Sequence, residues 1–543
     1  MGQIVHGSEC LPLATGKTVF DYADDLAVRV PTSCGRTGLC HECIVEVKSG
    51  QSSLSGTTEA EAFLRGDYRL ACQAVIEGSD QDIEFALLRS NPKILSTRPP
   101  KDLLLDPVVR REGESVLYGD EVIDKYRGRM YGVAIDLGTT TVVAELVDLE
   151  TGESVYLASF ENPQRFGGSD VMHRISYDSG AFHGELHKAV VNTLNQELRA
   201  MCRQLEFRRQ QIYEIVVVGN STMREIFFDL DVKSIGERPY KSSVENEYLA
   251  GKRETTALIE EARKLRLWAH PKAKVYAAPL IASHVGGDMA ADLVAIDLDS
   301  QDETVMIVDI GTNTEVVVAH EGRLMAASCP AGPAFEGGGI RYGMAAVDGA
   351  IETLRLNGTT EYEVIGGDEP RGLCGSGLID LIAELRRHDR ITPKGVFADK
   401  SQELAVIPDS GITFSREDAS NLAQAKAANF CGQLIVMRKL GLQPGYISKL
   451  YLAGGFANYV NVQHAIEIGF LASVPEDRVV KVGNAALQGA KELLLSKSKR
   501  TAIDSLVKTI EHVELETTPD FFEVFVEGCQ FKPMPQDLNT LGD

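Results

Sequence analysis

Four cysteines near the N-terminus have a spacing that could hold a metal centre. Cys34, Cys40 and Cys43 lie in PTSCGRTGLCHECIVEVKSG, and Cys72 lies in RLACQAV. Four thiolates bind either a tetrahedral zinc ion or an iron–sulfur cluster. Zinc ribbons usually pair two C-x-x-C motifs, but Cys72 has no such companion. The C-x5-C-x2-C spacing with a distant fourth cysteine is close to the plant-type [2Fe–2S] pattern, so we expect that cluster, with zinc or free thiols as the alternatives.

The residues around these cysteines favour a loop wrapped around a cluster. Gly35, Thr37 and Gly38 are small, so their backbone N–H groups can point at sulfur. Residues 1–94 resemble a [2Fe–2S] ferredoxin over roughly their whole length, which implies a β-grasp fold. The extra residue in the first spacing matches the adrenodoxin and putidaredoxin side of that family. Cys10 lies upstream of this spacing, and we expect it to be a core thiol.

Two further segments place an acid before a glycine turn. They are VAIDLGTTTVVAELVDLETG, with Asp136, and MIVDIGTNTEVVVAHEGR, with Asp309. Gly138 lets the backbone approach a phosphate, and successive N–H groups with threonine hydroxyls form an anion nest. Each carboxylate can hold Mg²⁺ or its waters. The repeat predicts two similar halves whose loops face each other and grip phosphates from both sides.

A third glycine segment, LAGGFANY, follows a predicted strand and suits close approach of the backbone to adenosine. Together the three segments resemble the actin/Hsp70/sugar-kinase ATPase superfamily over about 130–500, which implies a duplicated, ribonuclease H-like fold. The resemblance assigns catalytic, Mg²⁺-organising roles to Asp136 and Asp309, and ATP contacts to Gly138, Thr139, Thr140, Gly311, Thr312, Asn313, Glu336, Gly375, Ser376, Gly454 and Gly455. Two alternatives stay open: Glu336 as a helix cap, and Gly375-Ser376 as a plain strand–helix turn.

Composition limits the class of partner. The formal net charge of −23 disfavours nucleic acid and anionic membranes, because both need clustered cations. No apolar run is long enough to span a bilayer, and MGQIVHGSEC does not have the pattern of a signal peptide. Cysteines outside the cluster segment are scattered singly, which is typical of a reduced, cytoplasmic protein.

The chain reads as an α/β multidomain protein. We expect a ferredoxin-like domain over 1–94, a proline-containing linker or connecting element over 95–129, and an ATPase domain over 130–543. The ATPase domain divides into halves of about 130–300 and 301–543. The charged stretch from Tyr240 to Trp268 is expected to be a helix-prone surface insertion.

The whole chain resembles the reductive activators of corrinoid-dependent methyltransferases and O-demethylases. The resemblance is carried by NPQ-x-FG-x-DV-x-x-RI, VVGN-x-TM, DIGTN, AGPAFEGG, CGSGLID, LAGGF and GNAAL-x-GA. It implies a homodimer that uses ATP and an electron from an upstream donor to return a Co(II) corrinoid protein to Co(I). Two positions depart from the expected pattern: Thr314 replaces glycine, and Ala457 replaces glycine.

Other functions remain open from the residues alone. They are a small-molecule kinase with a redox regulatory domain, a nucleotide-gated redox sensor, and an activator of another low-potential enzyme. His284, Asp170 and Asn220 lie beside glycines and receive no role.

Overall fold

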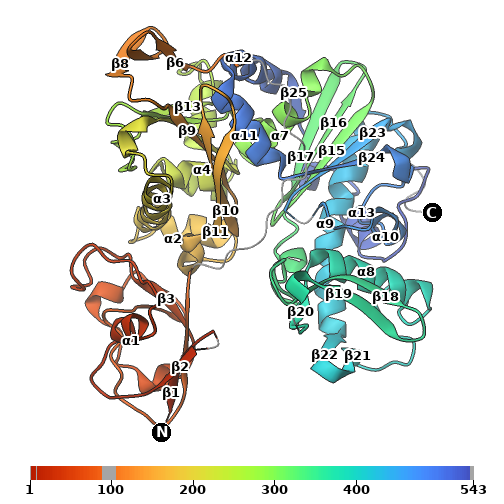
Figure 1. The fold of residues 1–543 in the computed structure, drawn as a ribbon. Coiled ribbons are helices and arrows are strands. Elements are labelled where there is room, and N and C mark those ends of the chain that lie inside the picture. The colour runs from red at the N-terminus through yellow and green to blue at the C-terminus, as the bar shows by residue number, and fades with distance from the viewer. Residues whose placement is uncertain (1, 8, 89–104, 368, 456, 539–543) are drawn as a thin grey trace.

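The computed structural model describes residues 2–7, 9–88, 105–367, 369–455 and 457–538 (Figure 1). Figure 1 shows the N-terminal residues as a separate lobe at the lower left, the first ATPase-like half above it, and the second half on the right. The predicted linker falls partly on 95–104, which lies outside the described residues. The predicted domain boundaries stay predictions.

The N-terminal lobe is a five-stranded β-grasp sheet with one helix. The strand order is β2-β1-β5-β3-β4, formed by β1 (Gln3–His6), β2 (Glu9–Pro12), β3 (Ile44–Ser49), β4 (Tyr68–Leu70) and β5 (Ile83–Leu87). Helix α1 (Val19–Asp25) starts at a capping box between Thr18 and Asp21, and its buried residues include Phe20 and Tyr22. The expectation for Cys10 was wrong, because it lies exposed on the edge strand β2.

A small antiparallel sheet follows, formed by β6 (Val109–Glu112), β7 (Ser115–Tyr118) and β8 (Glu121–Lys125). The Tyr213 hydroxyl donates to Asp124 at the end of this sheet (3.0 Å). The stretch predicted as a connecting element therefore has its own strands and is tied to the first ATPase-like half.

The two halves repeat one topology. The first sheet has the order β11-β10-β9-β12-β14-β13, and the second has the order β24-β23-β15-β16-β17-β25. Each contains a three-stranded antiparallel meander whose first strand pairs in parallel with a later strand. The bounds of the first are β9 (Tyr131–Leu137), β10 (Thr141–Asp148), β11 (Ser154–Glu161), β12 (Ile212–Val218), β13 (Leu258–Glu261) and β14 (Lys274–Ala277). Those of the second are β15 (Val305–Ile310), β16 (Thr314–His320), β17 (Arg323–Cys329), β23 (Lys449–Ala453), β24 (Val479–Gly483) and β25 (Ile510–His512).

Helices and two small sheets complete the halves. The helices are α2 (Val171–Asp178), α3 (Glu185–Gln204), α4 (Ser221–Phe227), α5 (Lys233–Gly236), α6 (Ser243–Leu249), α7 (Gly287–Ala295), α8 (Gly375–Arg387), α9 (Arg416–Lys439), α10 (Val462–Glu467), α11 (Ala485–Leu495), α12 (Lys497–Leu506) and α13 (Phe521–Gly528). The small sheets contain β18 (Ala350–Leu356), β19 (Thr360–Val364), β20 (Gly372–Leu373), β21 (Glu403–Ile407) and β22 (Ile412–Ser415). Among the described residues, no helix is both long and apolar enough to cross a bilayer.

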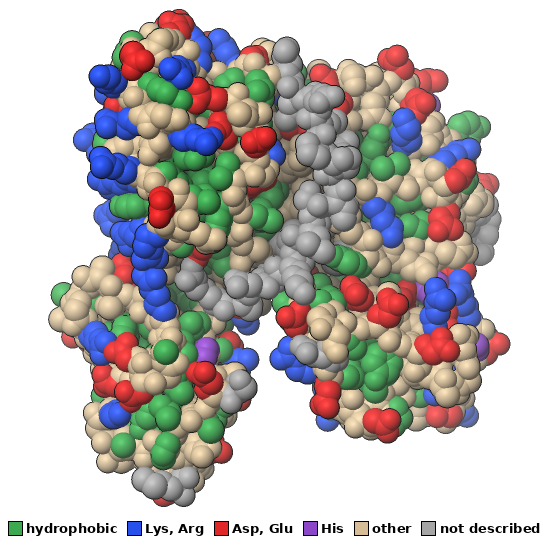
Figure 2. All heavy atoms as spheres, viewed as in Figure 1, with side chains coloured by type: hydrophobic (Ala, Val, Ile, Leu, Met, Phe, Trp, Pro, Cys, Tyr) green, Lys and Arg blue, Asp and Glu red, His purple; other side chains and the backbone are tan. Residues whose placement is uncertain are grey.

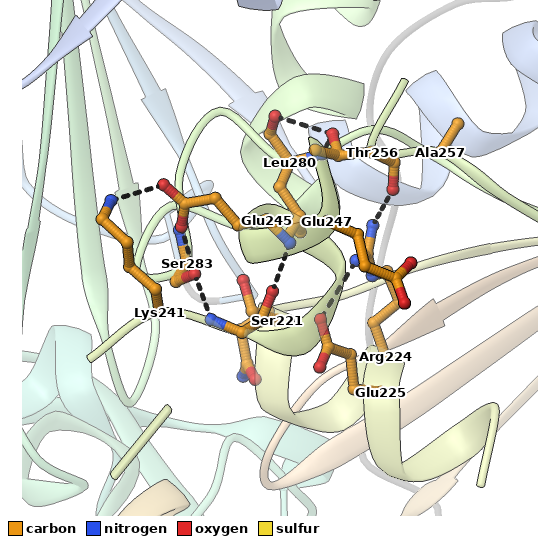
Figure 3. A network of polar contacts seen from close by, with 12 residues as sticks. Ser221, Arg224, Glu225, Lys241, Glu245, Glu247, Thr256, Ala257, Leu280 and Ser283 are labelled. Atoms are coloured by element: carbon orange, nitrogen blue, oxygen red, sulfur yellow. Dashed lines mark hydrogen bonds and ion pairs between the residues drawn. The ribbon is translucent and has the colours of Figure 1, made fainter. Parts of the chain in front are cut away.

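The segment from Tyr240 to Trp268 contains a helix, as predicted, in α6 (Ser243–Leu249), but it is not an insertion on the surface. It supplies β13, which pairs with β14 at the edge of the first sheet. Figure 3 shows why it is fixed there: the buried Arg224 guanidinium donates to the Thr256 carbonyl (2.9 Å), and Lys241 donates to Glu245 (2.7 Å). The charged composition misled the prediction, because one of these charges, Glu245, is buried and accepts hydrogen bonds from Lys241 and from the Ser283 N–H.

Helices α7 and α11 pack against each other between the two sheets. A Cβ atom at Gly489 in α11 would lie 1.9 Å from the carbonyl oxygen of Ala291 in α7, so only glycine permits this approach. The first residues of both helices face the cavity described below. The distance between these two helices therefore sets the position of cavity-lining groups.

We expect Gly489→Ala to lower the free energy of unfolding by about 1–3 kcal/mol, because the added methyl group overpacks a helix contact. Urea unfolding followed by circular dichroism measures the change. Gly445→Ala is the matched control, since a Cβ at Gly445 meets no atom within 4 Å. Equal midpoints for the two variants would contradict the helix-contact interpretation.

Candidate functional site

The two predicted phosphate loops meet at one cavity. The loop of residues 138–140 joins β9 to β10, and the loop of residues 311–313 joins β15 to β16. The cavity measures about 180 Å³ and lies where these hairpins converge with the first residues of α7 and α11. The predicted residues that line it are Asp136, Gly138, Thr139, Thr140, Asp309, Gly311, Thr312, Asn313, Glu336, Gly375, Gly454 and Gly455.

Ser376 is the one predicted ATP contact that does not line this cavity. Its hydroxyl donates to the Glu352 carbonyl (2.8 Å), so it fixes the turn into α8. Position 454 requires glycine for a packing reason. Its φ is +113°, and a Cβ there would lie 2.2 Å from the Ile310 carbonyl oxygen. The two departures, Thr314 and Ala457, are both buried and neither is a lining residue.

Glu336 joins the two loops across the cavity. Its Oε2 accepts a hydrogen bond from Thr140 Oγ1 (2.7 Å) and another from Thr312 Oγ1 (2.7 Å). The two hydroxyl oxygens are 3.2 Å apart. The carboxylate therefore bridges two threonines that the sequence predicts to bind phosphate. It does not serve as a helix cap.

Asp136 is held by a group that the sequence analysis did not select. Asn484 at the start of α11 donates to Asp136 Oδ2 (2.8 Å). Burial raises the pKa of Asp136 to about 7, although the Asn484 amide lowers it. Burial also raises the pKa of Asp309, to about 6. Asn484 lies in the GNAAL segment. The glycine–asparagine turn before a helix in this segment is the signal that could have identified Asn484.

Residues without an assigned role divide into those at the cavity and those away from it. Asn220 donates to Thr139 Oγ1 (3.0 Å), so it orients a residue of the first loop. Asp288 lines the cavity, and burial raises its pKa to about 7. Asp170 caps α2 through the His173 N–H (3.0 Å), and His284 packs edge-on against Tyr240; neither is a lining residue.

All the charged residues that line the cavity are carboxylates. Five of them face the cavity: Asp136, Asp288, Asp309, Glu315 and Glu336. A nucleotide triphosphate adds more negative charge, so a divalent cation is needed to bring the two together. In the parts of the chain that the structure describes, no three His, Cys, Asp or Glu side chains are grouped to hold an ion alone. These residues fit a Mg²⁺ that takes one or two carboxylates and completes its shell with phosphate oxygens and water.

The four predicted cluster cysteines form two pairs. Cys43 Sγ and Cys72 Sγ lie 3.4 Å apart. Cys34 Sγ and Cys40 Sγ lie 4.0 and 3.9 Å from the same Thr32 hydroxyl. In a [2Fe–2S] cluster each iron takes two of the four protein ligands, so two pairs fit it better than a single zinc ion does.

Local hydrogen bonds prepare these thiols for the anionic state. Burial opposes ionisation of Cys34, but hydrogen bonds from Thr37, Cys40 and neighbouring backbone groups lower its pKa to about 5. The hydrogen bond from Cys43 lowers the pKa of Cys72 to about 6, and the same contact raises the pKa of Cys43. Thiolates are the form that ligates iron.

The cluster lobe is docked on the first ATPase-like half. His41 Nδ1 lies 2.7 Å from Glu185 Oε2 on α3, and the Tyr177 hydroxyl donates to the Phe63 carbonyl (2.5 Å). The Phe63 ring stacks on His41 and meets Phe166 edge-on, with ring centroids 5.6 Å apart. These contacts place the loop around Cys40 beside α3.

Comparisons with known proteins agree along the whole chain. Residues 4–77 match the model for the 2Fe-2S iron–sulfur cluster binding domain, 131–301 that for the RACo middle region, and 303–540 that for the C-terminal, ASKHA domain of RACo. The chain is 28% identical to the corrinoid activation enzyme RamQ of Eubacterium limosum, covering 94% of this chain and 96% of RamQ. It is 25% identical to a Co(II) methylated amine-specific corrinoid protein reductase of Methanosarcina barkeri, covering 76% of this chain and 79% of that protein. A solved reductive activator for corrinoid, iron-sulfur protein superposes with a TM-score of 0.72 at 26% identity, covering 100% of both chains.

We expect Glu336→Gln to bind a non-hydrolysable ATP analogue with Mg²⁺ roughly three- to tenfold more tightly. The substitution removes a negative charge from the place where phosphate must enter, a gain of about 1 kcal/mol. Isothermal titration calorimetry measures the affinity. Glu363→Gln, on the exposed strand β19, removes the same charge away from the cavity and serves as the control. Weaker binding by Glu336→Gln would mean that the carboxylate contacts the metal instead.

Proposed function

The chain belongs to the family of RACo-type reductive activators of corrinoid proteins, and from this premise we propose that it uses ATP to drive reduction of a Co(II) corrinoid protein. One observation carries the proposal: a four-thiolate loop and a phosphate-binding cavity lie in one chain, in the order found end to end in relatives named as corrinoid activators. The substrate cobalt gains one electron and becomes Co(I), the methyl-accepting state. The [2Fe–2S] cluster, when bound, supplies a one-electron carrier.

The residues of the cavity bind and orient the nucleotide. The backbone N–H groups and hydroxyls of the two loops contact the β- and γ-phosphates from opposite sides, and Gly454 and Gly455 leave room for the adenosine. Asp136 and Asp309 would hold Mg²⁺ through carboxylate oxygens, and Asn484 keeps Asp136 in place. For the phosphates to reach Thr140 and Thr312, Glu336 must release both hydroxyls.

ATP acts through the relative position of the two halves. A ligand shifts a conformational equilibrium only by the difference in its affinity for the two states. Here both loops contribute to one phosphate site, so nucleotide binding favours the spacing of the two halves at which the hydroxyls of Thr140 and Thr312 contact phosphate and not Glu336. When this state binds the Co(I) form of the corrinoid protein more tightly than the Co(II) form, reduction of the cobalt becomes more favourable, and each 59 mV gained is about a tenfold change in the equilibrium.

The proposal has three further parts. The protein acts as a homodimer, receives its electron from an upstream donor, and works in the cytoplasm. The cytoplasmic location is supported by the ten cysteines, none of which forms a disulfide bond.

We expect Cys40→Ser to retain Mg²⁺–ATP binding within about twofold and to lower Co(I) formation by more than about a hundredfold, because the second ligand of one iron is lost. Anaerobic spectroscopy of the Co(I) absorption, with a corrinoid protein, a chemical reductant and ATP, measures the second quantity. Cys10→Ser is the control, since Cys10 is exposed and outside the cluster pairs. Undiminished Co(I) formation by Cys40→Ser would refute the proposed electron path.

Removal of Mg²⁺ with EDTA is expected to weaken ATP binding by more than about tenfold, because five carboxylates face the phosphates without a cation between them. Calorimetry with and without EDTA gives both affinities. Adenosine, which has no phosphate, is the control ligand, and its affinity should not change. Equal ATP affinities in the two conditions would exclude a metal-bridged phosphate site.

A further inference from the structure

A groove opens directly beside a cluster ligand. It measures about 340 Å³ and lies between the cluster loop and α3. The residues on its two sides include Leu39, Cys40 and His41 from the loop, and His187, Lys188 and Arg266 from the first ATPase-like half. Leu39 is 79% exposed, which is unusual for a leucine and gives a partner an apolar contact next to Cys40. The groove is therefore a place where another molecule can come close to the cluster.

One docking contact of the cluster lobe, His41, lines this groove. His41 is held by Glu185, and Glu185 also accepts from Lys188 (2.7 Å). Both residues of the His41–Glu185 pair are largely shielded from solvent, so this link is screened less than a surface pair would be. The docked lobe thus presents Cys40 and the cations of α3 together on one face.

A row of cations continues from the groove along α3. Lys188, Arg199 and Arg203 are spaced to lie on one stripe of the helix, which spans roughly 22 Å from the first to the last. Arg199 and Arg209 both lie over the ring of Trp268, the single tryptophan of the chain. We call Lys188, Arg199, Arg203, Arg209 and Arg266 the α3 basic strip. Figure 2 shows blue side chains gathered down this flank of the molecule, above the cluster lobe.

In the described part of the chain, most cations of the α3 basic strip have no acidic partner. Within the described residues, Arg199, Arg203, Arg209 and Arg266 have no acidic side chain at ion-pair distance, whereas Lys188 is paired with Glu185. The chain as a whole has a net charge of −23. A row of arginines without acidic partners on so acidic a protein, beside the half-buried cluster ligand Cys40, selects for a partner with a carboxylate-rich surface.

We propose that the α3 basic strip and the groove at Cys40 form the docking surface for an acidic electron-carrier protein, the donor that loads the cluster. This inference rests on the proposed function. The donor is distinguished from the corrinoid protein by position: the groove contains no residue of the two phosphate loops or of α11, so nucleotide does not act on it directly. Small, weakly held interfaces of this kind suit proteins that exchange electrons and separate quickly.

The transfer balances with one electron. A flavodoxin hydroquinone anion, taken as the probe donor, loses one electron and becomes the neutral semiquinone, without movement of a proton. The electron passes to the oxidised centre held by the four cysteines, which gains one unit of negative charge. The residues of the strip contact only the donor's carboxylates and form no bond in the step.

The test uses the full-length protein with its cluster and an acidic flavodoxin. In the triple variant Arg199→Glu, Arg203→Glu, Arg266→Glu, we expect the Kd of oxidised flavodoxin, measured by surface plasmon resonance, to rise at least about tenfold at low salt. The rate of semiquinone appearance, followed by stopped-flow absorption with the hydroquinone, should fall by a similar factor. Both differences should vanish at roughly 0.5 M salt, where exposed charges are screened.

A matched control carries the same charge change elsewhere. Arg323→Glu, Arg355→Glu, Lys394→Glu reverses three exposed cations of the second half and should keep both values within about twofold. Reduction by the methyl viologen radical cation should not be slower in the test variant. Unchanged Kd and rate in the test variant would overturn the proposal. It would also be overturned if the variant kept flavodoxin binding and lost cobalt reduction from chemically reduced enzyme, because the strip would then belong to the acceptor. The Kd and the semiquinone rate are measured without ATP or a corrinoid protein, so they test this inference separately from the proposed function, which the cobalt assay tests.

Discussion

The concentration of negative charge at the centre of the molecule is the constraint on which the rest depends. Five carboxylates face one cavity, and a sixth, Asp292, is fully buried on α7, where burial and the charge of Asp309 raise its pKa. Such a group of acids is stable only with partners or with protons. The partners here are an amide from α11 and two threonine hydroxyls from opposite halves. A phosphate ligand must replace these arrangements and bring its own cation, so the same electrostatic requirement makes the site specific for a metal-bound polyanion.

The NPQRF segment links this cavity to the cluster lobe. Asn162 Nδ2 donates to the carbonyl of Gly138 in the first phosphate loop (2.8 Å), and its Oδ1 accepts from the Gln164 N–H (2.9 Å). Two residues further on, Phe166 meets Phe63 of the cluster lobe edge-on. The NPQRF segment, to which we assign no catalytic or ligand-binding role, therefore contacts both functional sites. Through these contacts, a shift of the first loop on nucleotide binding can reach the docked lobe. Such a chain of contacts couples the two sites only if the lobe has two positions.

The sequence predicted the parts that are encoded by short spacing. The cysteine spacing, the acid–glycine–threonine turns and the period of the strands are local, and each predicts a cluster loop, a phosphate loop or a sheet from neighbouring residues. The role of Glu336 was not accessible in this way, because its partners Thr140 and Thr312 lie in different halves and meet only after the sheets fold. Asn484 was missed for the same reason, because its partner Asp136 lies 348 residues earlier in the sequence. The prediction for residues 240–268 failed for another reason: the charged composition indicated a solvated surface, but Glu245 is buried and pairs with the half-buried Lys241.

Charge also separates the two binding events that an activator requires, one with the electron donor and one with the nucleotide. The centre of the molecule repels anions unless they carry a cation, and the chain as a whole has a net charge of −23. The α3 basic strip is an exception, and it lies at the cluster, away from the nucleotide loops. An acidic donor is therefore steered to the cluster and kept from the cavity by the same field. Electron entry and nucleotide binding can then proceed on different faces of the first half, with the docked cluster lobe and the NPQRF segment between them.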